Sequence, residues 1–153
     1  MFFRIVAKLT LFLVILSYSA LVVYAYLPLE TSSTKELVTK DDLFIKVSDH
    51  DIRYREYRTP EDNNPNLILI HGFGNNLHSW RSITPLLSEH YNIFALDLLG
   101  FGLSDKPTDY DYSNANQAKT IGEFADALNL KAFIVGGHSL GGAIAFHVAM
   151  NNN

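Results

Sequence analysis

A serine flanked by glycines is the best candidate nucleophile in this chain. Ser139 lies in the sequence GHSLG, between an apolar run at 131–136 and another at 142–150. The first run predicts a buried strand and the second a buried helix. Together they predict a nucleophile elbow, a sharp turn that exposes the serine hydroxyl at the end of a sheet. Because strand and helix approach closely at such a turn, Gly137 and Gly141 supply the small residues it needs.

A serine hydroxyl on such a turn is suited to attack a carbonyl carbon, if backbone N–H groups stabilise the oxyanion that forms. The N–H of Leu140 would lie at a helix N-terminus and could donate to that oxyanion. Two further turns, His71–Gly74 and Asp97–Ser104, each follow a predicted buried strand. The carboxyl ends of parallel strands form the ligand crevice of α/β sheets. We interpret the His71–Gly74 turn as functional, and Gly100 and Gly102 as turn residues.

Strands and helices alternate along the chain after residue 42. Ser113 is the predicted cap of a helix over 114–129. Pro85 fits the first position of another helix, with Thr84 as its cap. This alternation predicts an α/β fold with a mostly parallel sheet and helices on both faces. The predicted strands are 43–47, 51–57, 66–70, 91–96 and 131–136, the second of which alternates apolar and charged residues.

Composition narrows the classes of function. The chain has a formal net charge of −4 and no basic patch, which argues against a nucleic-acid partner. It contains no cysteine, which excludes disulfides, a cysteine nucleophile and thiolate metal sites. These exclusions leave the serine chemistry as the leading interpretation.

The N-terminal segment 1–29 reads as a membrane or export element. Arg4 and Lys8 precede an uncharged run from Leu9 to Leu29, which as a helix spans roughly 31 Å, the thickness of a hydrocarbon core. We expect a single-pass anchor with a cytoplasmic N-terminus and an extracytoplasmic domain, because positive charge precedes the run. The alternative is a secreted or periplasmic protein after signal-peptide cleavage near Ala25. The polar segment 30–42 is predicted to be a linker.

The motifs after the linker resemble those of the α/β-hydrolase superfamily, from about Leu43 to the last residue. The resemblance rests on the order and spacing of HGFG at 71–74, of Asp97–Ser104 and of the GHSLG elbow. It implies that Ser139 is the nucleophile and that the backbone N–H groups of Phe73 and Leu140 form the oxyanion hole.

The same resemblance implies a serine hydrolase of the esterase or lipase type that forms an acyl-serine, with no metal and no organic cofactor. Its substrate would be a small ester, or a thioester, amide or activated C–C bond. Within the superfamily, dehalogenases and epoxide hydrolases carry aspartate at the elbow, so Ser139 argues against both. A cofactor-free perhydrolase or haloperoxidase-like activity keeps the serine and remains an alternative.

The residues after the elbow lack part of a catalytic triad. In this superfamily an acid and then a histidine follow the serine. Only 14 residues follow Ser139, none is Asp or Glu, and His147 lies about two helical turns away. We therefore expect residues 43–153 to be a partial hydrolase domain, truncated after the elbow helix and inactive alone. The alternative from another class is a non-catalytic, membrane-tethered interaction module, although no sequence feature specifies a partner.

Overall fold

The chain consists of two compact units, Met1–Leu37 and Val38–Asn153. The structure is a computed structural model and describes residues 2–27, 34–58 and 63–151. The predicted domain boundaries at 29/30 and 42/43 remain predictions, and residues 30–33 of the predicted linker lie outside the described residues. The second unit contains every strand that the structure describes.

The first unit contains helix α1 (Phe2–Tyr26) and the short helix α2 (Thr34–Leu37). Within α1, Ile5–Tyr26 is long and apolar enough to cross a membrane, since 22 residues of helix span about 33 Å. A signal sequence would have the same properties, so the finding is one apolar N-terminal helix of spanning length.

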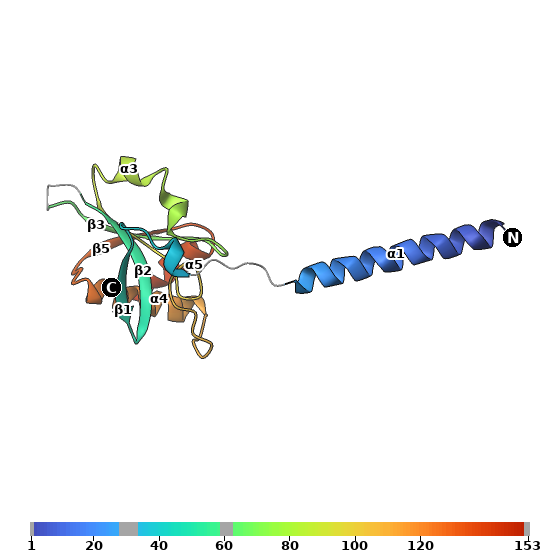
Figure 1. Ribbon diagram of the computed structural model, residues 1–153. Helices are drawn as coiled ribbons and strands as arrows, with labels where there is room; N and C mark the ends of the chain where they lie inside the picture. Colours follow the sequence, from blue (N-terminus) through green and yellow to red (C-terminus); the bar gives the residue numbers. More distant parts are fainter. Residues whose placement is uncertain (1, 28–33, 59–62, 152–153) are drawn as a thin grey trace. The chain divides into compact units, whose positions relative to one another are not determined.

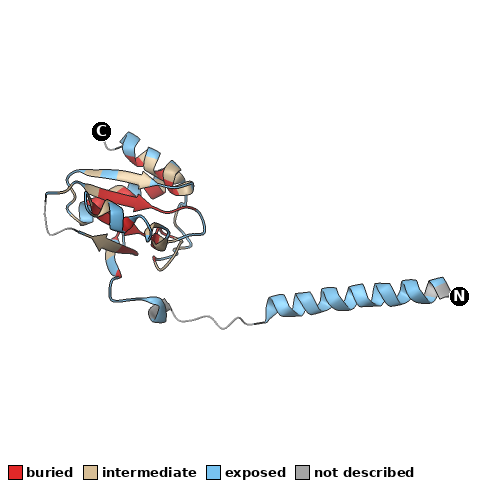
Figure 2. Cartoon of the chain, turned by 90° about the horizontal axis from the view of Figure 1, so that it is seen from above, coloured by how far each residue is buried: buried red, intermediate tan, exposed pale blue. Residues whose placement is uncertain are grey.

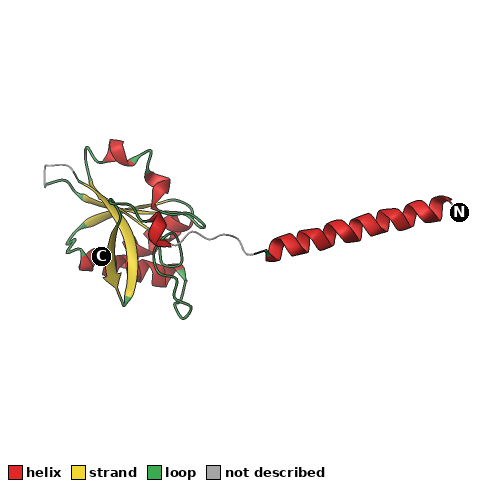
Figure 3. Cartoon of the chain, in the orientation of Figure 1, coloured by secondary structure: helices red, strands yellow, loops and turns green. Residues whose placement is uncertain are grey.

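The second unit is built on a five-stranded sheet with the order β1-β2-β4-β3-β5 (Figures 1 and 3). The pairs β3·β4 and β3·β5 are parallel, whereas β1·β2 and β2·β4 are antiparallel, so the sheet is mixed. The strands are β1 Leu43–Val47, β2 His50–Tyr57, β3 Asn66–Ile70, β4 Asn92–Leu96 and β5 Phe133–Gly137. Each lies within two residues of its predicted start, and the unbroken apolar runs of β3 and β4 match strands covered on both faces.

The β1–β2 hairpin closes through a two-residue loop. Ser48 and Asp49 have φ angles of 46° and 69°, and Val47 pairs with His50 across the loop. Positive φ at both loop residues matches the right-handed twist of a hairpin, and Asp tolerates that conformation well. The hairpin therefore joins the sheet as a unit at the outer edge.

Helices cover both faces of the sheet, as predicted for an α/β fold. On one face, α4 (Asn114–Ala127) and α5 (Leu140–Asn151) pack against Ile68, Ile70 and other core side chains. On the other face, the 3-10 helix η1 (Leu77–Trp80) and α3 (Thr84–Leu87) cover a smaller core that includes Leu67 and Leu69. Figure 2 shows the central strands as the most deeply buried part of the unit.

Two predicted helix caps have different outcomes. Ser113 is the N-cap of α4, and its hydroxyl accepts from the N–H of Asn116, as predicted. Thr84 is wrong as the cap of α3, because Ile83 occupies that position without a side-chain hydrogen bond. Thr84 is instead the first helical residue and is only 1% exposed, so packing against the core decides its place.

Candidate active site

Ser139 lies on a sharp turn between β5 and α5. Its φ of 54° is in the left-handed region, which costs a residue with a side chain about 1–3 kcal/mol. The turn is tied down by hydrogen bonds from the N–H groups of Gly142 and Ala143 to the Ser139 carbonyl, at 3.0 and 3.2 Å. The side chain of Ser139 is exposed at the carboxyl end of the parallel strands. A hydroxyl held there is open to a substrate.

The two predicted elbow glycines lie where no side chain fits. A Cβ on Gly137 would overlap the backbone of Gly141, and a Cβ on Gly141 would overlap the carbonyl oxygens of Ile70 and His71. The start of α5 therefore packs directly on the end of β5 and on the end of β3. This contact, at backbone distance, orients the turn that carries Ser139.

The turn after β3 lies beside the serine. A Cβ on Gly72 would stand 3.4 Å from the Cβ of Ser139, so the two backbones are close neighbours. Phe73 follows and is 81% exposed, and its ring makes an edge contact with Phe101 at 5.6 Å between centroids. Among the hydrogen bonds of the described residues, none has the N–H of Phe73 or of Leu140 as its donor. Two N–H donors near Ser139 are thus available to a ligand.

His71 connects the ends of β3 and β4. Its Nε2 accepts from the N–H of Leu98 at 3.1 Å, so Nδ1 carries the proton and donates to the Gly72 carbonyl at 2.7 Å. Burial lowers the pKa of His71, and the Gly72 hydrogen bond and the charge of Asp97 only partly oppose this. Both nitrogens are engaged and the ring is fully buried, so His71 shapes the turn and is not available as a base.

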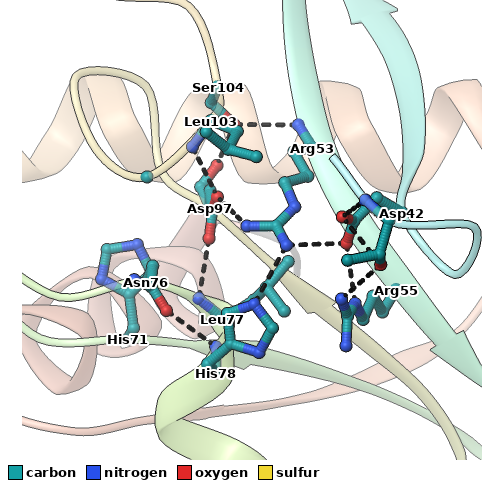
Figure 4. A network of polar contacts seen from close by, with 12 residues as sticks. Asp42, Arg53, Arg55, His71, Asn76, Leu77, His78, Asp97, Leu103 and Ser104 are labelled. Carbon is teal, nitrogen blue, oxygen red and sulfur yellow. Dashed lines mark hydrogen bonds and ion pairs between the residues drawn. The ribbon is translucent and has the colours of Figure 1, made fainter. Parts of the chain in front are cut away.

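Asp97 holds two loops at once from the end of β4. Its carboxylate accepts from the N–H groups of Leu77 and Leu103, at 2.7 and 2.8 Å, and from the Arg53 guanidinium at 3.2 Å (Figure 4). A Cβ on Gly102 would overlap this carboxylate, which explains the glycine at that position. Since Leu77 ends the loop that carries Phe73, Asp97 fixes the base of that loop.

Arg53 is the centre of a buried network of charges. Its side chain is 3% exposed and reaches Asp97 through Nη1 and Asp42 through Nη2, the latter at 2.7 Å. Asp42 also accepts from Nε of Arg55 at 2.7 Å and from the Thr39 backbone N–H at 2.8 Å. Two cations therefore face two carboxylates, and the cluster is electrically balanced.

The pKa values of two groups in this network are shifted. Burial by itself raises the pKa of the Asp42 carboxyl, but hydrogen bonds from Arg55, Thr39 and Arg53 outweigh it and hold that pKa well below its usual range. His78 accepts from Nη2 of Arg53 at 3.0 Å. Its pKa is lowered by burial and by the charges of Arg55 and Arg53. His78 is therefore a neutral member of the network.

The structure brings together all the residues predicted to form the site, namely Ser139, Phe73, Leu140, Gly137 and Gly141, and their catalytic roles remain proposals. The network around Arg53 was missed in the sequence, because the alternation in β2 makes a charged residue at that position look solvent-facing. Its signal was instead an acidic residue, Asp42, just before the first strand. Among the described residues, no three His, Asp or Glu side chains gather as metal ligands would.

Several known proteins that resemble this chain are named as hydrolases. An uncharacterized hydrolase of Bacillus subtilis is 35% identical over 99 residues, which cover 65% of this chain and 36% of that protein. The 2-hydroxy-6-oxo-6-(2'-aminophenyl)hexa-2,4-dienoic acid hydrolase of Metapseudomonas resinovorans is 39% identical over 89 residues, or 55% of this chain and 30% of that protein. An epoxide hydrolase and a fluoroacetate dehalogenase are also similar.

Among solved structures, the crystal structure of a membrane phospholipase A matches with a TM-score of 0.68 and 31% identity, covering 95% of this chain and 47% of that one. The chain thus spans less than half of the length of this structure and about a third of the length of the two curated relatives. The family model described as the alpha/beta hydrolase fold matches residues 65–153, which is more than half of the sequence. The chain belongs to the α/β-hydrolase family.

Proposed function

We propose that this chain supplies the nucleophile and the oxyanion hole of a serine hydrolase that cleaves carboxylic esters. The observation that carries the proposal is the exposed Ser139 at a left-handed φ, between β5 and α5, beside two backbone N–H groups without an acceptor. An aspartate would be required for the ester intermediates of the dehalogenase and epoxide-hydrolase relatives, and this elbow carries serine.

In the proposed reaction, Ser139 Oγ attacks the carbonyl carbon of the ester. The carbonyl oxygen becomes an oxyanion, which accepts hydrogen bonds from the N–H groups of Phe73 and Leu140. The intermediate collapses to an acyl-serine and releases the alcohol, and a water molecule then hydrolyses the acyl-serine. A serine hydroxyl is a weak nucleophile unless a base removes its proton. Thioesters, amides and activated C–C bonds would follow the same steps.

We propose that the base and its orienting acid belong to the complete protein outside residues 43–153. His71 and His78 are engaged in hydrogen bonds that hold loops, and residues 140–153 contain neither Asp nor Glu. The relatives are about three times as long as the matched segment, which leaves room for both groups.

The test compares two forms of the protein, residues 1–153 alone and the longest chain that its coding sequence specifies. Both are offered a fluorophosphonate probe and p-nitrophenyl esters. The longer form should be labelled and should turn over, and Ser139→Ala should abolish labelling and cost several powers of ten in turnover. Ser79→Ala, at another exposed serine, is the control and should change neither.

Two results would contradict the proposal. Labelling of the longer form that survives Ser139→Ala would remove Ser139 as the nucleophile. Turnover by residues 1–153 alone that depends on Ser139 would show that the base lies within this chain. Phe73→Ala should cost far less than Ser139→Ala, because the proposed donor is the backbone N–H.

We further propose that α1 anchors the protein in a membrane with the N-terminus in the cytoplasm. Two observations support the anchor. The first is the length of α1. The second is that the match to the membrane phospholipase covers 95% of this chain, whereas Val38–Asn153 alone is 116 of 153 residues, so the match extends into the first unit. Carbonate extraction and protease protection of a C-terminally tagged chain test this. Release of a soluble form that begins near Tyr26 would instead indicate a cleaved signal peptide.

A further inference from the structure

An apolar pocket of about 390 Å³ lies beside the two proposed oxyanion donors. Its volume is at the lower end of the range for small-molecule sites, which suits a compact group of one or two rings. Leu140 and Phe73 form the side of the pocket nearest the elbow, so a substrate bound at Ser139 would extend into it. The other lining residues are Gly100, Phe101, Lys106, Tyr112, Gln117 and Ile144.

The aromatic walls of this pocket are fixed by their own contacts. Phe101 meets both Phe73 and His71 in edge contacts, at 5.6 and 5.5 Å between centroids. The ring of Tyr112 lies directly over Gly100, where a Cβ would overlap it, and its hydroxyl donates to the Pro107 carbonyl at 2.8 Å. The pocket is therefore a preformed apolar space whose walls offer few polar groups.

Lys106 also lines the pocket, and its Nζ donates to the carbonyls of Gly102 and Ser104 at 2.9 and 3.0 Å. Gln117 is the lining residue with a buried polar side-chain atom that has no partner among the described residues. It lies in the first turn of α4 and is 3% exposed. Its Nε2 donates to the Leu99 carbonyl at 3.0 Å, which fixes the amide, whereas its Oε1 is buried and accepts no hydrogen bond from the described residues. A buried acceptor without a donor is costly, and leucine or methionine would fill the same space without that cost.

We propose that Gln117 is a specificity residue that selects substrates whose apolar part carries an N–H or O–H donor for its Oε1. This inference rests on the proposed function for the identity of the ligand as a substrate, and on the pocket alone for the binding. The substrate class is an ester with a compact aromatic or branched group that bears one hydrogen-bond donor. The pocket would favour such a group over the same shape without the donor.

The test uses indole and benzofuran, two bicyclic probes of nearly the same shape that differ in having a ring N–H or a ring oxygen. The full chain is placed in lipid nanodiscs, and the dissociation constant of each probe is measured from the methyl signal of Ile144. Indole should bind roughly fivefold more tightly or better, the gain of one hydrogen bond in a buried site. Equal affinities, or tighter binding of benzofuran, would overturn the proposal.

Variants identify the acceptor. Gln117→Leu and Gln117→Met should bring the affinity ratio of the two probes close to one. Partition of the probes into lipid does not affect the comparison between variants, because every variant is measured in the same lipid. Tyr112→Phe is the matched control, which removes another polar group of the wall and should keep the preference. A preference that survives both Gln117 variants would overturn the proposal. The comparison in the unchanged chain decides the question even if both variants fail to fold.

Ser139→Ala separates this inference from the proposed function. The binding preference needs no chemistry at the serine, so this variant should bind indole and benzofuran in the same ratio as the unchanged chain. Loss of the preference together with Ser139 would overturn the assignment to Gln117. A preference for indole in a protein that proves not to be a hydrolase would support the binding role of Gln117, and the ligand would then not be a substrate.

Discussion

The two sides of the proposed site are held by different physical interactions. On the side of β2 and β4, buried charges fasten the loops: Arg53 joins Asp42 to Asp97, and Asp97 holds the loop that leads back to Phe73. On the side of β5 and α5, no ion pair is present among the described residues, and backbones touch across Gly137 and Gly141.

The two sides should therefore tolerate different kinds of substitution. A network of charges depends on the presence of every member, because removing one leaves the others buried and unpaired. A close backbone contact tolerates no added side chain, because even one methyl group would overlap the neighbouring backbone. The turn that carries Ser139 is thus held by the close backbone contact that Gly137 and Gly141 allow, and the loop that carries Phe73 is held by the ion pairs and hydrogen bonds of the network.

The largest effect should come from breaking the network. Arg53→Met leaves two carboxylates buried without their common cation and should lower the free energy of unfolding by about 3–5 kcal/mol. Urea unfolding of the chain in mild detergent, followed by the fluorescence of Trp80, measures it. Arg58→Met removes a half-exposed arginine paired with Glu56 and should cost less than about 1 kcal/mol. Equal losses in the two variants would show that the buried network contributes no more to stability than an exposed ion pair does.

A methyl group at the elbow should come next. Gly137→Ala forces the start of α5 away from β5 and should destabilise by about 1–3 kcal/mol, with the loss of any labelling at Ser139. Gly122→Ala is the matched control, because Gly122 lies within helix α4 and a Cβ there would have no neighbouring atom within 4 Å. It should raise the stability by up to about 1 kcal/mol. Thermal unfolding measures the stability of both variants. A Gly137→Ala variant more stable than Gly122→Ala would refute the steric account.

The smallest effect is a dependence on pH. The pKa of His71 in the folded chain is lowered by burial, whereas in the unfolded chain it is about 6.5. The unfolded state therefore binds a proton first, and stability that is complete above pH 6.5 falls as the pH drops toward the folded pKa. The slope should be at most about 1.4 kcal/mol per pH unit for this group.

The pKa of His78 is lowered in the same direction, so the slope should be reduced but not abolished in His71→Gln. Urea unfolding at several pH values between 7.5 and 5 measures the slope. His90→Gln, at an exposed loop position, is the control and should keep the slope of the unchanged chain. An unaltered slope in His71→Gln would contradict the assignment.

The fold was predictable from the sequence where local pattern decides structure. The continuous apolar runs of β3 and β4 are long enough to identify buried strands, and Ser113 caps α4 through a hydrogen bond to a residue three positions away. Thr84 was misread because its side chain is buried by packing from residues distant in sequence, which no local rule describes.

The site was predictable only in part, for the same reason. A serine between glycines is visible in a five-residue motif, and its geometry follows from the strand and helix on either side. Arg53 finds its partners 11 residues before it and 44 residues after it, and alternation in a strand says nothing about either. The unpaired oxygen of Gln117 is equally invisible, since it depends on what α4 packs against.

The exposed ring of Phe73 has a consequence for how relatives of this chain can diverge. The atom proposed to act at position 73 is a backbone nitrogen that every amino acid except proline presents with a hydrogen, whereas the side chain forms a wall of the neighbouring pocket. A change in the codon for this residue therefore alters which molecule fits without altering how the oxyanion is held. If the proposed function holds, new substrate preferences can accumulate here by single substitutions while the proposed reaction is inherited unchanged.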